Sequence, residues 1–334
     1  MEKLRIGLIG CGGRSGAHQS SFEKMDNVRI VAVADPIEER RLKAANRFSC
    51  TRIYKNHTEL YDNESADTLD AVVICIEPTA HTDTETRAIE LGIPFLVEKP
   101  MTLDIEQADK IAAMIKEKNL ITCVGFQDRY LDLMETVKAE VDKRPAGGLV
   151  YGAWVGGIPG VWWWQKKTDC GGQLIEQNIH LADGLRFLYG EPLSVYATCS
   201  KGMVKPGVDA SEEYDTDDHS TAVYRFKNNV TATLVSGCYS KGVRPRCGLY
   251  IALPDIILDY RLRNNLIITT AEGQTDTPRG VDQTYLLDKA FVEAILTNNP
   301  SLIRSDYADA LKSLKMTMAA NESMESGKVI YFND

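Results

Sequence analysis

Hydrophobic and polar positions alternate along the first third of the chain in a way that predicts a layered α/β domain. The predicted strands are the short apolar runs at residues 4–10, 28–34, 71–76, 93–97 and 121–126. The stretches between them carry apolar residues at helical spacing, which predicts helices at residues 15–25, 37–47, 79–91 and 104–118. Apolar strands that alternate with helices are typical of a parallel sheet covered on both faces. The pattern therefore predicts a doubly wound Rossmann domain over residues 1–123.

From residue 124 onward, apolar and polar residues alternate singly and the runs break at Gly, Pro and Asn. This period is typical of an open, mostly antiparallel sheet. The predicted hairpin turns are 227–229 and 263–265, and the predicted helices are 174–189, 284–297 and 306–326. Because 334 residues exceed the size of a single core, we expect a second α+β domain over residues 124–334, for substrate binding and oligomerisation.

Composition narrows the class of protein. Apolar residues make up 44% and charged residues 25%, as is usual for a soluble protein, and no run of eighteen apolar residues suits a membrane. The net charge of −9 speaks against a nucleic-acid partner. The eight cysteines include no CxxC pair, so neither a disulfide framework nor a metal site is expected. With no signal-like N-terminus, these features predict a cytoplasmic protein.

The segment GLIGCGGRSGAH follows the first predicted strand and opens the first predicted helix. Gly10 and Gly12 allow the tight turn and close approach that a pyrophosphate needs at a helix N-terminus. Ser15 takes the third glycine position of the usual spacing. Asp35 ends the next strand, where a carboxylate accepts hydrogen bonds from ribose hydroxyls and repels a 2′-phosphate. These features favour NAD over NADP, although Asp35 alone would also suit a turn before Pro36.

Charged residues follow the apolar strand at 93–97 without a spacer, in the order Glu98, Lys99 and Pro100. Ligands of open α/β sheets bind beyond the carboxyl ends of the strands, and Lys99 lies just past such an end. An ammonium there can stabilise an alkoxide that forms as hydride leaves a carbinol carbon. Glu98 fits two roles equally, as a contact to the nicotinamide ribose or as a plain ion-pair partner.

The helix predicted at 174–189 carries Glu176, His180 and Asp183 at positions that share one face. A histidine between carboxylates in a buried helix is either a satisfied core network or an acid–base site. An ordinary imidazole, with a pKa near 6.5, suits proton acceptance from a hydroxyl. Together with Lys99, the histidine favours the acid–base interpretation.

Three landmarks together resemble the Gfo/Idh/MocA family of sugar and cyclitol dehydrogenases: the glycine-rich turn at 10–16, EKP at 98–100, and GGQLIEQNIHLAD at 171–183. Residues 300–332 are also similar to the family's closing helix and strand. The resemblance covers nearly the whole chain and implies an N-terminal Rossmann domain and a C-terminal open-sheet domain.

The resemblance also implies roles for single residues. Lys99 corresponds to the lysine that binds the reacting hydroxyl, and His180 to the proton acceptor. Glu176 stands where the family usually has Asp, and Asn178 stands where it commonly has Gly, which adds a possible substrate contact. Residues expected to contact the cofactor are Gly10, Gly12, Gly13, Arg14, Ser15, Asp35, Pro78, His81, Glu98 and Lys99.

Substrate contacts are predicted from two further segments. Gln127, Arg129 and Tyr130 follow the last Rossmann strand, at the expected domain junction, where hinge packing is the alternative. Three consecutive tryptophans at 162–164 cannot all face one core, so Trp163 and Trp164 are predicted to form a wall for a sugar ring, with a subunit interface as the equal alternative. The acidic segment 211–219 is predicted to be a solvated loop.

The sequence thus predicts an NAD-dependent oxidoreductase that takes hydride from a secondary hydroxyl of a sugar, glycoside or cyclitol. Two alternatives stay open: an NAD-dependent glycosidase or lyase that uses transient redox chemistry, and a non-catalytic sensor of NAD or sugar. The open sheet predicts a homo-oligomer, either a dimer or a tetramer, because an outer sheet face is usually covered by another subunit.

Overall fold

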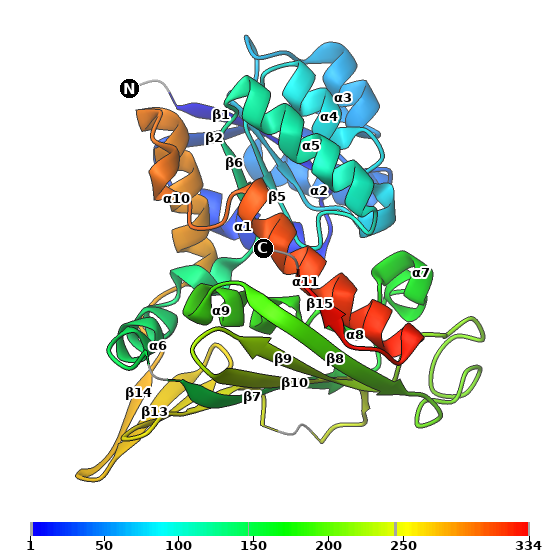
Figure 1. Cartoon of the computed structure of the whole chain (residues 1–334). Helices are drawn as coiled ribbons and strands as arrows, with labels where there is room; N and C mark the ends of the chain where they lie inside the picture. The colour runs from blue at the N-terminus through cyan, green and yellow to red at the C-terminus, as the bar shows by residue number, and fades with distance from the viewer. Residues whose placement is uncertain (1–2, 146, 244–245, 333–334) are drawn as a thin grey trace. The chain divides into compact units, whose positions relative to one another are not determined.

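The computed structural model describes residues 3–145, 147–243 and 246–332, which divide into two compact units. The first unit runs to Gln127 and also takes in Asp282–Leu311 (Figure 1). The second unit comprises Asp128–Val281 and the chain from Lys312 onward. The first unit therefore includes a segment far away in sequence, which a continuous division between residues 123 and 124 leaves out.

The first unit is built on a six-stranded sheet in the order β3-β2-β1-β4-β5-β6, with every neighbouring pair parallel. Its strands are β1 (Leu4–Ile9), β2 (Val28–Ala34), β3 (Arg52–Tyr54), β4 (Ala71–Ile74), β5 (Phe95–Val97) and β6 (Thr122–Val124). Its helices are α1 (Gly13–Phe22), α2 (Glu38–Phe48), α3 (His57–Asn63), α4 (Thr84–Glu90), α5 (Ile105–Lys118) and α10 (Gln283–Thr297). The predicted doubly wound Rossmann sheet is confirmed.

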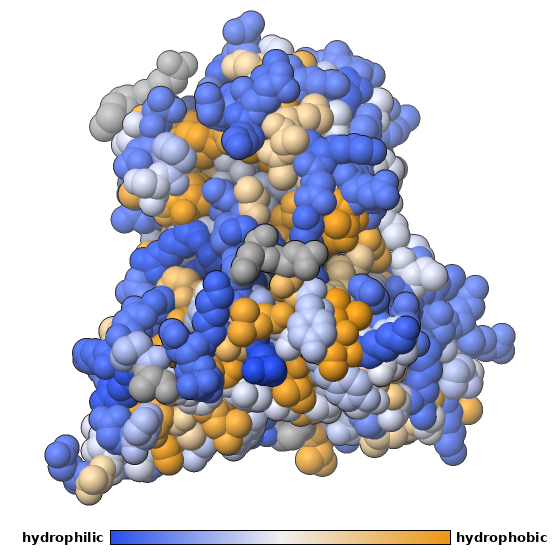
Figure 2. All heavy atoms as spheres, viewed as in Figure 1, coloured by the Kyte–Doolittle hydropathy of each residue, from blue (hydrophilic) through white to orange (hydrophobic). Residues whose placement is uncertain are grey.

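Local sequence explains most of these elements. The strands β4, β5 and β6 are buried along their whole length, as expected where helices cover both faces. The three-residue strand β3 and the helix α3 were not predicted, because their apolar runs are too short to stand out. Helix α4 begins later than predicted because Pro78–Ala80 forms a separate 3-10 turn. Helices α3, α4 and α5 lie side by side, and their outer surface is mostly hydrophilic (Figures 1 and 2).

The segment Asp282–Leu311 belongs to the first unit through direct contacts with its sheet. The Val124 amide donates a hydrogen bond to the Ser305 carbonyl at 2.9 Å, which continues the edge of β6. Tyr307 packs edge-on against Phe95 of β5, with ring centroids 6.2 Å apart. Helix α10 packs against α1, so the last part of the chain supports the helix that follows the glycine-rich turn.

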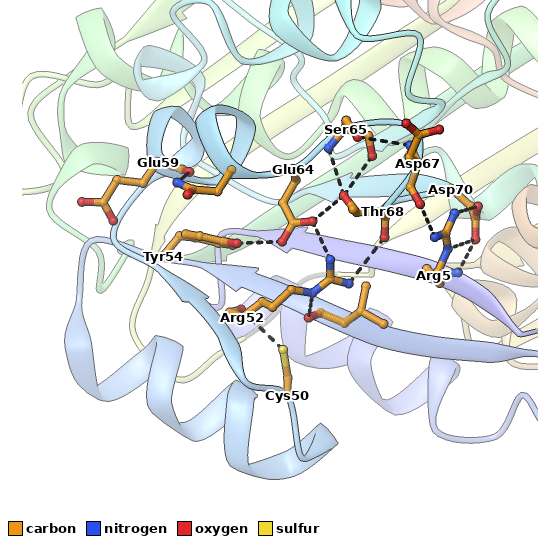
Figure 3. Close-up of polar contacts among 12 residues, drawn as sticks. Arg5, Cys50, Arg52, Tyr54, Glu59, Glu64, Ser65, Asp67, Thr68 and Asp70 are labelled. Carbon is orange, nitrogen blue, oxygen red and sulfur yellow. Dashed lines mark hydrogen bonds and ion pairs between the residues drawn. The ribbon is translucent and has the colours of Figure 1, made fainter.

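Polar side chains fasten β3 to the connection between α3 and β4 (Figure 3). The buried Glu64 carboxylate accepts hydrogen bonds from Tyr54 at 2.7 Å and from Thr68 at 2.6 Å, and it also pairs with Arg52. Because each of its oxygens has a partner, the buried charge is compensated. This cluster stabilises the outer strand of the sheet.

The second unit contains a nine-stranded sheet in the order β14-β13-β12-β11-β7-β10-β9-β8-β15. Its strands are β7 (Gly148–Gly157), β8 (Pro192–Ser200), β9 (His219–Phe226), β10 (Val230–Ser240), β11 (Gly248–Ala252), β12 (Ile257–Arg261), β13 (Asn265–Thr270), β14 (Gly273–Pro278) and β15 (Ile330–Tyr331). Among the strand pairs of the described residues, the central β7–β10 pair alone is parallel, so the predicted, mostly antiparallel sheet is confirmed. The turn between β9 and β10 carries Asn228 and Asn229, both with φ of 59°, as a tight hairpin requires.

Helices cover one face of this sheet. They are α6 (Asp132–Asp142), the short α7 (Lys167–Cys170) and α8 (Gln173–Glu176), α9 (Ile179–Tyr189) and α11 (Tyr307–Ser326), which starts in the first unit. The core packs Val137 of α6, Leu185 of α9 and Met316 of α11 against strand residues such as Val150. On the opposite face Leu149, one residue earlier on β7, is 58% exposed. The sheet therefore has one buried and one open face.

Two predictions in this unit are wrong. The helix predicted at 174–189 is interrupted, since α8 ends at Glu176 and α9 begins at Ile179. The acidic segment 211–219 is only partly a solvated loop, because Asp217 and Asp218 are buried. Asp218 accepts hydrogen bonds from the Val204 amide and the Tyr214 hydroxyl at 3.1 and 3.2 Å, which ties the loop to the end of the sheet.

Over the described ranges, no helix is both long and apolar enough to cross a membrane.

Candidate functional site

The glycine-rich turn joins β1 to α1 and is shaped by Gly10. Its φ is +86°, and a Cβ at this position would lie 2.2 Å from the carbonyl oxygen of Cys75. Only glycine fits such a close approach in the left-handed region. Gly12 caps α1 and Gly13 begins it. Both line a cavity of about 470 Å³, together with residues of α2 that include Arg40.

Asp35 lies directly after β2, beside this turn, and is 4% exposed. Its carboxylate accepts hydrogen bonds from the Cys11 amide at 2.7 Å and from the Ile37 amide at 2.8 Å. Asp35 thus holds the glycine-rich turn against the end of β2. The Arg40 guanidinium lies 3.7 Å from the position of a Cβ on Gly12, whereas Arg41 binds the carbonyls of Asp35 and Pro36.

Glu98 follows β5 and is the centre of a buried polar cluster. Arg14 of α1 donates to its Oε1 at 2.8 Å, and His18 Nε2 lies 3.0 Å from the same oxygen. Of the two roles predicted for Glu98, the described contacts support the ion-pair role. Burial alone would raise the pKa of the Glu98 carboxyl. The charges and hydrogen bonds of Arg14 and His18 outweigh burial and lower this pKa to about 2. Lys99 is the next residue, and its amide donates to Glu98 Oε2 at 3.3 Å.

Sequence reasoning missed His18 and its second partner, Asp288 of α10, whose Oδ1 lies 2.6 Å from His18 Nδ1. Both side chains are fully buried. The spacing of Arg14 and His18, four residues apart on one helix, was a usable signal. No local signal pointed to Asp288, because it lies 270 residues further along the chain.

Three predicted cofactor residues occupy packed positions. Ser15 is 1% exposed and accepts a hydrogen bond from Gln19 of the same helix at 3.1 Å, which favours helix packing over a cofactor contact. Pro78 is buried at the start of a 3-10 turn. His81 is 2% exposed and pairs with Glu85 one turn along the chain. The turn after β4 is thus fixed by its own side chains.

In the second unit, His180 lies in the first turn of α9 and is 5% exposed. Its ring stacks on Trp154 of β7, with centroids 5.8 Å apart and planes 26° from parallel. Glu176 ends α8 and is also buried. Because α8 and α9 are separate helices, Glu176 and His180 do not share one continuous helix face as predicted.

Asn178 lies in that bend and is 0% exposed. Its amide group donates to the Val235 carbonyl at 3.1 Å and to the Ser236 hydroxyl at 2.6 Å, both on β10. The buried amide fastens the start of α9 to the sheet, and a substrate contact of Asn178 stays a prediction. Among the remaining candidates, Gln127 is 3% exposed at the end of the first unit.

A cavity of about 760 Å³ lies at the end of β7 and involves the second unit alone. Trp164 lines it, as do Trp154, Gln177 and Arg246, which were not predicted. Trp163 is not part of the lining but stacks on Trp164 with centroids 6.1 Å apart. The cavity combines two indole walls with amide and guanidinium donors, a combination that suits the faces and hydroxyls of a sugar.

The structure therefore groups the predicted residues within each unit. The glycine turn, Asp35, Glu98 and Lys99 follow the carboxyl ends of β1, β2 and β5, which lie at one edge of the parallel sheet. His180 and Glu176 lie near the indole-lined cavity of the other unit. Lys99 and His180 belong to different units, so their meeting at one substrate stays a prediction. Between residues 3 and 332, leaving aside the gaps at 146 and 244–245, no group of metal-binding side chains is found.

Two protein-family models match this chain, one over each domain. Residues 4–126 match the Gfo/Idh/MocA model described as an oxidoreductase family with an NAD-binding Rossmann fold, and residues 148–252 match the Gfo/Idh/MocA C-terminal domain. The chain belongs to the Gfo/Idh/MocA family. The resemblance drawn from the three sequence landmarks is thereby confirmed, as is the NAD-binding character of the first domain.

Similar proteins include a scyllo-inositol 2-dehydrogenase (NAD(+)) from Bacillus subtilis, 22% identical over 98% of this Gfo/Idh/MocA chain and 95% of that protein. The rhizopine catabolism protein MocA from Rhizobium meliloti is 28% identical over 63% of this chain and 66% of that protein. A solved levoglucosan dehydrogenase, in complex with NADH and L-sorbose, has a TM-score of 0.87 and 18% identity, with both chains covered completely. This last likeness shows that the fold is shared.

Proposed function

We propose that this protein is an NAD-dependent dehydrogenase that oxidises a secondary hydroxyl of a sugar, glycoside or cyclitol. The observation that carries the proposal is the position of Lys99, which follows β5 at the carboxyl edge of an NAD-binding Rossmann sheet and is backed by the buried Glu98. The inositol dehydrogenase and levoglucosan dehydrogenase among the similar proteins support a polyol or sugar substrate.

The residues of the glycine-rich turn fit NAD. A cavity of about 470 Å³ lies over Gly12 and Gly13, and no side chain of the turn fills it. Amides at the start of α1 suit the pyrophosphate, and the Asp35 carboxylate suits the ribose hydroxyls while repelling a 2′-phosphate. When bound, NAD supplies the hydride acceptor. Asp35 favours NAD over NADP, and Arg40 beside Gly12 offers a cation to the same ligand.

Side chains of this protein take the acid–base and electrostatic roles in the proposed reaction. In the proposed reaction, the Lys99 ammonium donates a hydrogen bond to the reacting hydroxyl and stabilises its developing negative charge as hydride leaves. The His180 imidazole accepts the proton of that hydroxyl. The buried Glu176 carboxylate supports the imidazolium that results. Trp154 and Trp164 hold the sugar ring against their faces in the cavity at the end of β7.

The open face of the nine-stranded sheet supports a homo-oligomer. Leu149, Tyr151 and Tyr196 are 58%, 46% and 46% exposed on strands whose alternate residues are buried. Exposed apolar residues on a broad sheet face suit burial against a second copy of the chain, as a dimer or a tetramer. All eight cysteines are free thiols, which agrees with the reducing cytoplasm as the proposed compartment.

A panel of sugars, glycosides and cyclitols with NAD or NADP tests the proposal. Nicotinamide absorbance reports net NADH formation, and mass spectrometry identifies the products. A dehydrogenase produces NADH and a ketone in equal amounts with at least one polyol. Cleaved glycoside without net NADH would instead identify the glycosidase alternative, and binding of NAD and sugar without any turnover would identify the sensor.

A further inference from the structure

Four charged side chains form a cluster in the first unit: the buried His18, Glu98 and Asp288, and the partly exposed Arg14. They come from α1, the end of β5 and α10. The side chains of His18 and Asp288 are 0% exposed, and that of Glu98 is 6% exposed. Charged side chains are rarely buried so completely unless they are paired, so each buried charge requires a partner of opposite charge within the cluster.

His18 bridges the two carboxylates. Its Nδ1 lies 2.6 Å from Asp288 Oδ1, and its Nε2 lies 3.0 Å from Glu98 Oε1. An ionised carboxylate only accepts hydrogen bonds, so the ring satisfies both partners only when it donates from both nitrogens. The ring is then an imidazolium. With Arg14 also bound to Glu98, two positive and two negative charges balance within the cluster.

The surroundings of His18 favour its charged form. Burial alone would lower the pKa of His18. The Asp288 and Glu98 carboxylates outweigh burial and raise this pKa to about 9. Burial raises the pKa of Asp288, and the nearby His18 opposes that shift. The nearby Cys75 thiol adds no charge, since burial raises its pKa well above the ordinary value.

Glu98 has little freedom to move. A Cβ on Gly125 would lie 2.4 Å from Glu98 Oε1, so the chain just after β6 touches the carboxylate on one side. His18 and Arg14 hold the same oxygen on the other side. The second oxygen accepts the Lys99 amide at 3.3 Å. The position of the Lys99 main chain therefore depends on where the cluster holds Glu98.

We propose that His18, as an imidazolium anchored by Asp288, is the positioning residue that fixes Glu98 and thereby the main chain at Lys99. It acts through Glu98 and does not touch the substrate. Because His18 also lies on α1, the same side chain connects the helix behind the glycine-rich turn to the lysine that the reaction uses. The catalytic part of this inference depends on the proposed function of Lys99, whereas the protonation and ordering parts do not.

The protonation state can be measured in the unmodified protein. Long-range nitrogen–proton NMR spectra of the five imidazoles distinguish an imidazolium from either neutral tautomer, and single substitutions of His57, His81, His180 and His219 assign the remaining signal to His18. We expect His18 to be doubly protonated at pH 7 and to lose a proton near pH 9. A neutral His18 at pH 7 would overturn the proposal.

The positioning role is tested with His18→Gln. His57→Gln is the matched control, since His57 also pairs with a carboxylate of the first unit, Asp83, at 2.8 Å, but lies in α3. Hydrogen exchange of the peptide that contains Lys99 and Met101 should become faster in His18→Gln and stay unchanged in His57→Gln.

With a substrate found in the panel, kcat should fall roughly 10- to 100-fold in His18→Gln while NAD still binds, since small misplacement of a reacting group has effects of this size.

A second variant separates positioning from general damage. We expect kcat to fall at alkaline pH as His18 loses its proton. Asp288→Asn keeps the ring but removes the carboxylate that favours its charge, so this fall should move to lower pH, together with the NMR titration of His18. Unchanged exchange and unchanged kcat in a folded His18→Gln would overturn the positioning role. If no polyol is oxidised, the proposed function fails, but the exchange and NMR results still decide whether His18 orders the chain at Lys99.

Discussion

The guanidinium of Arg129 and the carboxylate of Asp183 form two parallel hydrogen bonds, from Nε to Oδ2 at 2.8 Å and from Nη2 to Oδ1 at 2.6 Å. Both residues are buried, and the Ser313 hydroxyl donates to the same carboxylate at 2.6 Å. Asp183 lies on α9 three residues after His180. The pair therefore fastens the helix that carries the proposed base, and it supports the packing alternative for Arg129, whose predicted substrate contact stays a prediction.

Replacement of Arg129 by Gln should be strongly destabilising, because it leaves the Asp183 charge buried without its main partner. We expect the free energy of unfolding to fall by about 3–5 kcal/mol in urea denaturation. The control is Arg144→Gln, which removes a similarly bidentate pair with Asp255 at the surface and should change stability little. Equal losses of unfolding free energy in the two variants would show that the buried Arg129–Asp183 pair stabilises the fold no more than the surface pair of Arg144 and Asp255.

The contrast between Arg129 and Gly10 shows what the sequence could predict. The glycine-rich turn is a local feature, in which a strand, a tight turn and a helix start follow one another between Leu4 and Gly13, so its position could be predicted from spacing alone. The partner of Arg129 lies 54 residues away and is chosen by tertiary packing, which spacing does not report. The His18–Asp288 contact was missed for the same reason. Fold class followed from periodicity, but the bend between Glu176 and Ile179 did not, because its apolar spacing continues through the break.

Gly10 and Gly13 should respond differently to an added methyl group. Gly10→Ala should lower the free energy of unfolding by at least about 1–2 kcal/mol, since alanine disfavours a φ of +86° and its Cβ meets the Cys75 carbonyl. At Gly13 no atom lies within 4 Å of an added Cβ, so stability should be kept. Because Gly13 lines the cavity at the turn, Gly13→Ala should still weaken NAD binding. Thermal unfolding and NAD titration separate the two effects, and normal NAD affinity in Gly13→Ala would place the pyrophosphate elsewhere.

Lys99→Met should remove the electrostatic contribution while leaving the nucleotide site intact. We expect kcat to fall by roughly 10²-fold or more, the usual effect of one lost electrostatic donor, with NAD affinity retained. Lys110→Met on the exposed side of α5 is the control and should have wild-type kinetics. Steady-state rates with the best substrate, together with NAD titration, measure both quantities. Full turnover in Lys99→Met would end its assignment to the reaction.

Adjacent tryptophans offer a test of the substrate cavity. Trp164 lines the cavity and its Nε1 donates to Gln173 at 3.2 Å, whereas Trp162 is 62% exposed. Trp164→Leu should raise KM by roughly tenfold through lost stacking on the sugar, and Trp162→Leu should leave KM unchanged. Should the substitution at Trp162 alone raise KM, the sugar would lie on the outer side of this segment.

The depressed pKa of Glu98 predicts a specific loss of stability in acid. Its pKa is lowered from 4.5 to about 2, because Arg14 and His18 favour the carboxylate more than burial opposes it. A group with a lower pKa in the folded state stabilises the fold above its unfolded pKa, and this stabilisation is lost as the pH falls through the folded value. Between about pH 4.5 and 2, the wild-type protein should therefore lose stability more steeply than Glu98→Gln, which has no carboxylate to protonate at this position.

Urea unfolding of the two proteins across this range measures the difference directly, because other acidic groups titrate in both proteins. The raised pKa of His18 has the opposite sign: its contribution is complete below about pH 6.5 and is lost as the pH rises through about 9. The combined contribution of Glu98 and His18 should thus be greatest between about pH 4.5 and 6.5, where both groups are charged. If stability falls equally steeply with decreasing pH in wild type and Glu98→Gln, the carboxylate is not stabilised by the charges of Arg14 and His18.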